Sequence, residues 1–198
     1  DIVGVNMSEP TETRQAVEAL GRRFLTVKAD LSSTGVIPPV VEQAVAAFGR
    51  IDILVNNAGI IRREDALSFT EQDWDDVMNV NIKTVFFLSQ AVAHQFIKQG
   101  NGGKIINIAS MLSFQGGIRV PSYTASKSAV MGVTRLLANE WAKHNINVNA
   151  IAPGYMATNN TQQLRDDEDR SKAILDRIPA GRWGVPEDMM GPVEFLAS

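Results

Sequence analysis

The chain contains no cysteine, only two histidines and no apolar run long enough to cross a bilayer. The missing cysteines exclude disulfide bonds, cysteine nucleophiles and thiolate metal sites. No ligand-like spacing surrounds His94 or His144, so we expect both to be structural and predict no metal. The net charge is -3 and no long basic run occurs, so the sequence does not indicate a basic surface for nucleic acid. We therefore expect a cytoplasmic globular protein that binds a small molecule, without membrane or nucleic-acid partners.

Short apolar runs alternate with longer segments of helical periodicity along the chain. The runs are IVGV, FLTVKAD, IDILVNNAG, KIINIAS and NVNAIAPG. Each run is apolar at most positions, as strands buried on both faces are, and the alternation predicts parallel strands joined by helices. We therefore predict an α/β fold, a Rossmann-like doubly wound parallel sheet with helices on both faces, in a single domain over residues 1–198.

The pattern becomes polar after Gly154, and residues 155–186 are predicted to form a substrate-loop insertion above the sheet. The charged run within it, residues 164–172, has two interpretations. One is a solvated helix face with mixed charges. The other is part of a mobile lid over the substrate, because the insertion directly follows a strand end.

Ser110, Tyr123 and Lys127 combine residue types that suit proton transfer. Tyr123 and Lys127 are four residues apart in a helical pattern over 121–144, so they lie on one helix face, one turn from each other. A nearby cation lowers the pKa of a phenol from its usual ~10. Ser110 closes the run KIINIAS, where open α/β sheets place their ligands. For the Tyr–Lys pair alone, a surface helix with a half-buried aromatic residue is the alternative.

Five motifs occur in a fixed order: NNAG at 56–59, Asn81, Ser110, YTASK at 123–127 and PGYMAT at 153–158. Together they resemble the short-chain dehydrogenase/reductase family, and the likeness covers the whole chain. The stretches IRREDAL and MLSFQGGIRVPSYTASKS are similar to members that act on deoxy sugar acids in pectin breakdown. The resemblance implies hydride transfer between NAD and a sugar-acid substrate. It also implies a homotetramer built on the helices around residues 80–98 and 122–143.

The resemblance assigns roles to individual residues. Tyr123 would be the general acid/base, Lys127 would lower its pKa and bind the nicotinamide ribose, and Ser110 would donate a hydrogen bond to the substrate oxygen. Asn81 would hold a water in the proton path, unless it bonds only locally within its helix. NNAG taken alone could also be a plain turn. The cofactor contacts implied, besides Tyr123 and Lys127, are Asp30, Leu31, Asn57, Met156 and Thr158.

The choice between NAD and NADP depends on the group that meets the ribose 2'-hydroxyl. The matching position falls near Asn6, where NAD enzymes usually have an aspartate. No arginine or lysine between Asn6 and Thr13 could pair with a 2'-phosphate, and Glu9 would repel one. We therefore predict NAD rather than NADP.

A sugar-acid substrate needs a cation for its carboxylate, and arginine suits that task because it pairs bidentately. The loops after the predicted strands and the late insertion contain Arg62, Arg63, Arg119 and Arg182. Arg119 lies between Ser110 and Tyr123 and is our hypothesis for the substrate contact. A surface arginine without a role is the alternative.

The chain departs from the family at both ends. A sheet of this type begins with a central strand and a glycine-rich turn that holds the pyrophosphate, but no G-x-x-x-G-x-G run occurs here. We therefore expect the first strand with its turn, and the last strand, to be lacking, and the chain to be a portion of a longer protein. Two functional alternatives stay open: a family member acting on gluconate or a 3-oxoacyl group, and a non-catalytic truncated fragment.

Overall fold

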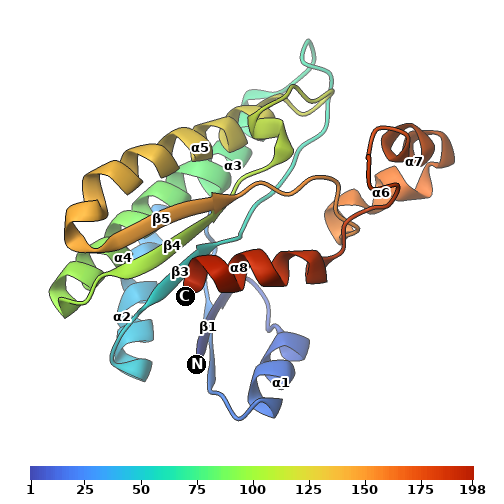
Figure 1. Cartoon of the computed structure of the whole chain (residues 1–198). Helices are drawn as coiled ribbons and strands as arrows, with labels where there is room; N and C mark the ends of the chain where they lie inside the picture. Colours follow the sequence, from blue (N-terminus) through green and yellow to red (C-terminus); the bar gives the residue numbers. More distant parts are fainter.

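The computed structural model of the chain describes all 198 residues and contains two parallel sheets flanked by helices (Figure 1). The first sheet pairs β1 (Ile2–Asn6) with β2 (Phe24–Lys28), and α1 (Thr11–Ala19) connects them. The second sheet has the order β3-β4-β5, with β3 (Ile53–Asn56) beside β4 (Gly103–Ile108) and β4 beside β5 (Ile146–Ile151). All five strands coincide with the predicted apolar runs.

The helices cover both faces of the second sheet. α4 contacts β3 and β4, α5 contacts β4 and β5, and Figure 1 shows α8 on the opposite side of these strands. The remaining long helices are α2, which packs on β2 and α4, and α3, which packs on α5. The bounds are α2 (Ile37–Phe48), α3 (Glu71–Met78), α4 (Thr84–Gln99), α5 (Pro121–Trp141), α6 (Gln162–Asp166), α7 (Glu168–Leu175) and α8 (Met190–Ala197).

Short helical turns connect these elements. One is a π-helical turn, η2 (Asn79–Lys83), between α3 and α4. The others are 3₁₀ turns: η1 (Thr34–Val36), η3 (Met111–Ser113), η4 (Ala142–His144), η5 (Asn159–Thr161) and η6 (Pro186–Met189). None of the helices combines the length and the apolar character that a membrane-spanning segment requires.

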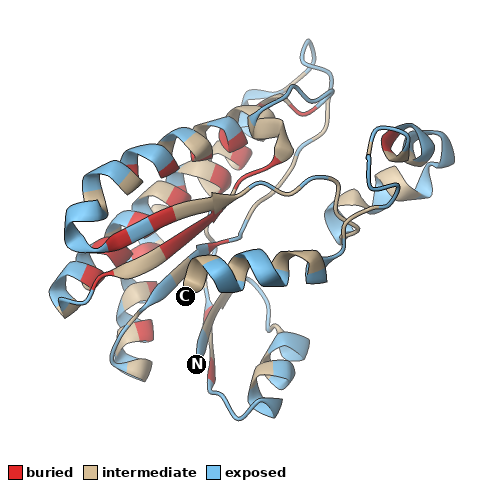
Figure 2. Cartoon of the chain, in the orientation of Figure 1, coloured by how far each residue is buried: buried red, intermediate tan, exposed pale blue.

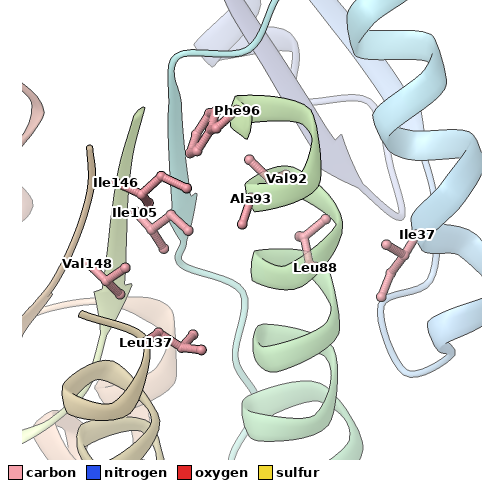
Figure 3. Close-up of a cluster of buried hydrophobic side chains, with 9 residues drawn as sticks. All are labelled: Ile37, Leu88, Val92, Ala93, Phe96, Ile105, Leu137, Ile146 and Val148. Atoms are coloured by element: carbon pink, nitrogen blue, oxygen red, sulfur yellow. The ribbon is translucent and has the colours of Figure 1, made fainter. Parts of the chain in front are cut away.

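The core lies between the second sheet and α4 and α5. Phe96 of α4 and Ile105 of β4 are fully buried, and Figure 3 shows them with side chains from α2, α5 and β5 in the same cluster. Figure 2 shows buried residues along β4 and β5 and on the helix faces turned towards them. Burying a side chain of this size stabilises the fold by about 1.5–3 kcal/mol. This packing holds α5, which carries Tyr123 and Lys127, in a fixed relation to β4, which Ser110 follows.

The predicted fold class is confirmed: the strands are parallel and helices flank them on both sides. The doubly wound sheet is divided, because β1 pairs only with β2 and β3 pairs only with β4. This division agrees with the expectation that a central strand is lacking. No strand follows β5 along the chain. Residues 155–186 contain α6 and α7, which stand away from the sheets beyond the carboxyl end of β5 (Figure 1).

Candidate active site

The carboxyl ends of β3, β4 and β5 meet at one edge of the second sheet. The strands are in parallel register, with Asn56 beside Asn107 and Asn107 beside Ala150. Beyond the strand ends, the backbone N–H of Met111 donates to the Pro153 carbonyl at 2.9 Å. The NNAG loop, Ser110 and the PGYMAT loop therefore come together, as the sequence predicts for a ligand site in an open α/β sheet.

Helix α5 brings Tyr123 and Lys127 to the same edge. It begins at Pro121, whose fixed φ suits the first turn of a helix. Lys127 is 4% exposed, and its Nζ donates to the Ile108 carbonyl at 2.5 Å. The same ammonium group lies 5.7 Å from the centre of the Tyr123 ring. Ser113 donates to the Lys127 carbonyl at 2.7 Å, so the turn that follows Ser110 is tied directly to α5.

Burial dominates the electrostatics of Tyr123. It raises the pKa of the phenol, whereas hydrogen bonding to Ser110 and the positive charge of Arg63 lower that pKa. The predicted proximity of Ser110 and Tyr123 is thus present. The ammonium group of Lys127 donates to the carbonyl of Ile108, and its predicted effect on the phenol stays a prediction. Burial in turn lowers the pKa of Lys127 to about 8.

Ser110 has a proton available for a ligand. Its Oγ accepts a hydrogen bond from the backbone N–H of Leu112 at 3.2 Å, and its side chain is 7% exposed. A hydroxyl that accepts from the backbone can still donate its own hydrogen. Ser110 is therefore held in place by Leu112, and its hydroxyl hydrogen can still be donated to an oxygen bound beside Tyr123.

Asn81 holds the NNAG loop in place from the π-helical turn. It is fully buried; its Nδ2 donates to the Ile60 carbonyl at 2.9 Å and its Oδ1 accepts from the Ile60 N–H at 2.9 Å. Its Nδ2 also lies 3.2 Å from the hydroxyl of Ser126. π-Helical turns are frequent at functional sites. The amide is occupied by backbone groups, so its role in holding a water stays a prediction.

Gly59 shows that NNAG is more than a surface turn. A Cβ at this position would lie 3.4 Å from Asn81 Oδ1 and 3.7 Å from Lys127 Nζ. The backbone therefore passes directly beside two of the predicted catalytic residues, and a side chain at Gly59 would fill the space next to the ammonium group.

The residues that match cofactor contacts lie at the ends of β2, β3 and β5. Asp30 is exposed, and hydrogen bonds from Ser32 lower the pKa of its carboxyl. The Leu31 carbonyl accepts from Thr84 at 2.6 Å, which ties the end of β2 to α4. Asn57 is exposed after β3. After β5, Thr158 N–H donates to the Met156 carbonyl at 3.0 Å.

A basic residue on α1 was not foreseen when residues 6–13 were used to predict the choice between NAD and NADP. Arg14 of α1 pairs with Glu9 at 2.9 Å and donates to Thr26 at 2.8 Å. Arg14 follows directly after residues 6–13, and the first turn of α1 directs it towards Thr26 of β2. A cation thus lies beside the β1–β2 sheet, and Glu9 pairs with it.

Three of the four candidate arginines already have acidic partners. Arg119, the hypothesised substrate contact, is half exposed and has a φ of 62°, and like Arg62 and Arg182 it forms ion pairs. Only Arg63 has none, and its Nη2 donates to the Asn160 carbonyl at 2.8 Å. The pairs are Arg62 with Asp73 and Asp76 at 3.3 and 3.2 Å, Arg119 with Glu64 and Asp65 at 3.5 and 3.6 Å, and Arg182 with Asp188 at 2.7 Å.

The profile of the short chain dehydrogenase family matches residues 2–169. The chain belongs to this family. It is 78% identical over its whole length to the 2-dehydro-3-deoxy-D-gluconate 5-dehydrogenase of Escherichia coli K12 and 52% identical to that of Bacillus subtilis, and spans 78% of each. Among solved structures, a gluconate 5-dehydrogenase from Burkholderia cenocepacia in complex with NADP and tartrate is 36% identical, with a TM-score of 0.93. That likeness covers 100% of this chain and 78% of the other.

This short-chain dehydrogenase is therefore an oxidoreductase of a family that uses nicotinamide cofactors. The relatives named above include enzymes for a deoxy sugar acid and for gluconate. Its motifs were sufficient to place it in the family from sequence. Arg63 is the residue whose effect on Tyr123 the motifs did not reveal, because it depends on how the loop after β3 folds towards α5.

Proposed function

We propose that this dehydrogenase interconverts 2-dehydro-3-deoxy-D-gluconate and 3-deoxy-D-glycero-2,5-hexodiulosonate with NAD as cofactor. The observation that carries the proposal is the meeting of Ser110, Tyr123 and Lys127 at one sheet edge. The choice of substrate is supported by the 78% identity to the E. coli relative of that specificity. A substrate of this kind has a secondary alcohol or ketone that exchanges a hydride and a proton.

The residues present fit a nicotinamide cofactor. Asn57 is exposed and Gly59 leaves open the space beside Lys127, where a ribose hydroxyl would be bound. When bound, NAD accepts or supplies the hydride. The residues that would hold it are Asp30, Leu31, Asn57, Tyr123, Lys127, Met156 and Thr158. We favour NAD because Glu9 neutralises Arg14, so a 2'-phosphate would meet a carboxylate as well as a cation.

The chain's own residues would manage the proton and the developing charge. In reduction, Tyr123 gives its phenolic proton to the substrate oxygen; in oxidation, it takes the proton from the substrate hydroxyl. Ser110 donates a hydrogen bond to the same oxygen, where negative charge develops. Arg63 lowers the pKa of the phenol against the opposing effect of burial, which favours the deprotonated form needed for oxidation.

We also propose that the protein assembles as a homotetramer through α4 and α5. Their outer surfaces contain a hollow of about 300 Å³ lined largely by apolar side chains, among them Phe86, Ile97, Leu136 and Trp141. Ile97 and Leu136 are 44% and 47% exposed. Apolar side chains clustered on one surface favour contact with another subunit.

The deciding experiment measures NADH oxidation at 340 nm with the hexodiulosonate, for the wild type and for Tyr123→Phe. The substitution should lower kcat by at least about 100-fold, the usual contribution of general acid–base catalysis, while the melting temperature stays close to that of the wild type. Equal activity in the two proteins would refute the role of Tyr123. Faster turnover with NADPH would contradict the cofactor proposal, and faster turnover of 5-ketogluconate would favour gluconate 5-dehydrogenase activity instead.

A further inference from the structure

Ser113 is a serine of the turn η3 whose hydroxyl contacts the backbone of two predicted catalytic residues. Its Oγ donates to the Lys127 carbonyl at 2.7 Å and accepts from the Ser110 N–H at 3.3 Å. A carbonyl can only accept and an N–H can only donate, so the one hydrogen of the hydroxyl is committed to Lys127. Ser113 therefore has no hydrogen to give to a ligand, in contrast to Ser110, which caps the same turn.

The hydrogen bond from Ser113 to Lys127 is the only one that joins η3 to α5. Along the chain the two elements are connected by residues 114–119, all of which are exposed. This segment includes Gly116 and Gly117, which restrict the backbone less than other residues do. The connecting segment is therefore a weak constraint on the position of η3 relative to α5, whereas Ser113 joins the two elements directly.

A second contact holds α5 to the same strand end. Lys127 Nζ donates to the carbonyl of Ile108, two residues before Ser110, at 2.5 Å. The side chain of Lys127 thus contacts the end of β4, and its carbonyl contacts the turn that follows β4. Tyr123 lies one turn before Lys127 on α5, with its ring centre 5.7 Å from Nζ. The hydrogen bonds of Ser113 therefore connect the backbone of the serine donor with the helix that carries the tyrosine.

We propose that Ser113 is a positioning residue for hydride transfer, which sets the place of Ser110 relative to α5. This inference rests on the proposed function in that Ser110 donates to the reacting oxygen. A displacement of about 1 Å in a catalytic group can lower the rate by about 100-fold. Without the Ser113 hydroxyl, the Ser110 N–H loses its acceptor and η3 loses its hydrogen bond to α5. Ser113 therefore affects the rate through Ser110.

The test measures kcat and KM with the hexodiulosonate and NADH for the wild type, Ser113→Ala, Ser110→Ala and the double variant. Ser113→Ala should lower kcat by about 10- to 100-fold, because Ser110 is misplaced. KM for NADH should change by less than about 2-fold, since the proposed cofactor contacts do not include Ser113. Ser110→Ala should lower kcat by about 100- to 1000-fold, the usual loss for one oxyanion donor.

The double variant separates positioning from a general loss of structure. Adding Ser113→Ala to Ser110→Ala should lower kcat further by less than about 2-fold, because the hydroxyl that Ser113 positions is already gone. Losses that multiply in the double variant would overturn the proposal, as would wild-type kcat in Ser113→Ala. Ser113→Cys repeats the comparison with a side chain of similar shape whose thiol is a weak donor, and the chain has no cysteine with which it could form a disulfide.

Thr70→Ala is the matched control for stability. The Thr70 hydroxyl caps α3 by accepting from the Asp73 N–H at 3.1 Å, and it donates to the Asp73 carboxylate at 2.8 Å. Thr70→Ala therefore removes one accepted and one donated hydrogen bond, as Ser113→Ala does. The two variants should melt at similar temperatures, while only Ser113→Ala loses kcat. An equal loss of kcat in Thr70→Ala would contradict the positioning role.

Failure of this inference can be distinguished from failure of the proposed function, because the comparison needs only a ketone that the wild type reduces. If the wild type reduces 5-ketogluconate and not the hexodiulosonate, and the loss in Ser113→Ala disappears in the Ser110→Ala background, the inference holds and the proposed substrate is wrong. Turnover of the hexodiulosonate with equal kcat in the wild type and Ser113→Ala supports the function and overturns the inference. Hydrogen exchange followed by mass spectrometry needs no turnover: the Ser110 amide should exchange faster in Ser113→Ala, and an unchanged rate would overturn the proposed link.

Discussion

Lys127 is a charged group that the folded protein buries at a cost, and that cost is measurable. Its side chain is 4% exposed, no acidic residue pairs with it, and its Nζ donates only to the Ile108 carbonyl. Burial lowers the pKa of the ammonium group from 10.5 to about 8. At 1.36 kcal/mol for each pKa unit, this difference corresponds to about 3 kcal/mol of folding free energy.

The dependence on pH follows from the two pKa values. Below about pH 8, Lys127 is charged in both the folded and the unfolded chain, so the folded chain bears the full cost. Between about pH 8 and 10.5 the folded chain has released the proton while the unfolded chain keeps it. Unfolding therefore takes up a proton in this range, and stability rises with pH until the cost has disappeared.

Replacing Lys127 with methionine removes the charge and keeps a similar length. The substitution loses the hydrogen bond to Ile108, at about 1 kcal/mol, and removes the cost of about 3 kcal/mol. Lys127→Met should therefore be about 2 kcal/mol more stable than the wild type at pH 7. This advantage should shrink through pH 8–10.5 and end as a small deficit.

Urea unfolding at intervals from pH 6.5 to 10.5 measures the difference between the two proteins, so the titration of all other groups cancels. Lys98→Met, at an exposed position on α4, controls for the loss of a surface lysine. A constant difference across the range would refute the link to burial. A variant that is less stable at pH 7 would show that the ammonium group stabilises the fold.

Two further substitutions test the packing and the assembly. Asn107→Ala should lower the free energy of unfolding by about 2–3 kcal/mol in urea, because the buried Asn56 amide loses one of its two acceptors and the Thr134 hydroxyl loses its donor. Asn147→Ala, at an exposed position of β5, should change it by less than about 0.5 kcal/mol. Leu136→Glu places a charge in the apolar contact and should dissociate the proposed tetramer, as measured by sedimentation equilibrium. Ile118 is exposed and lies outside α4 and α5, so Ile118→Glu should leave the measured mass unchanged. A tetramer in Leu136→Glu would place the subunit contact elsewhere.

The elements of the fold could be predicted because their signals are local. The helical pattern over residues 121–144 became α5 followed by the turn η4 (Ala142–His144), and each apolar run became a strand. The π-helical turn at Asn81 could not be predicted in this way. It differs from an α-helix by one residue of hydrogen-bond spacing, and its position depends on the contact of the Asn81 amide with Ile60.

For Tyr123 and Lys127, the sequence could not predict the direction of the long lysine side chain. Helical spacing correctly placed them one turn apart, but it did not decide where four methylene groups would carry the ammonium group. The carbonyl of Ile108 at the end of β4 accepts its hydrogen bond, and the ammonium group lies 5.7 Å from the centre of the phenol ring. Burial raises the pKa of Tyr123, while Ser110 and Arg63 lower it, and both of these residues come from segments outside α5 that helical spacing cannot reveal.

The sequence also could not predict which arginines pair with acidic residues, and for this reason chain position alone favoured Arg119 as the carboxylate contact. Arg119 lies between two catalytic residues in the chain, whereas Arg63 lies near neither. In the folded chain, carboxylate oxygens of Glu64 and Asp65 lie within 3.6 Å of the Arg119 guanidinium and partly offset its charge. These carboxylates would compete with a substrate anion for Arg119, whereas no acidic side chain pairs with Arg63, so Arg63 is a second candidate to test beside Arg119. This difference in pairing depends on segments distant in sequence, and it predicts that Arg63→Ala raises KM for an acidic substrate more than Arg119→Ala does.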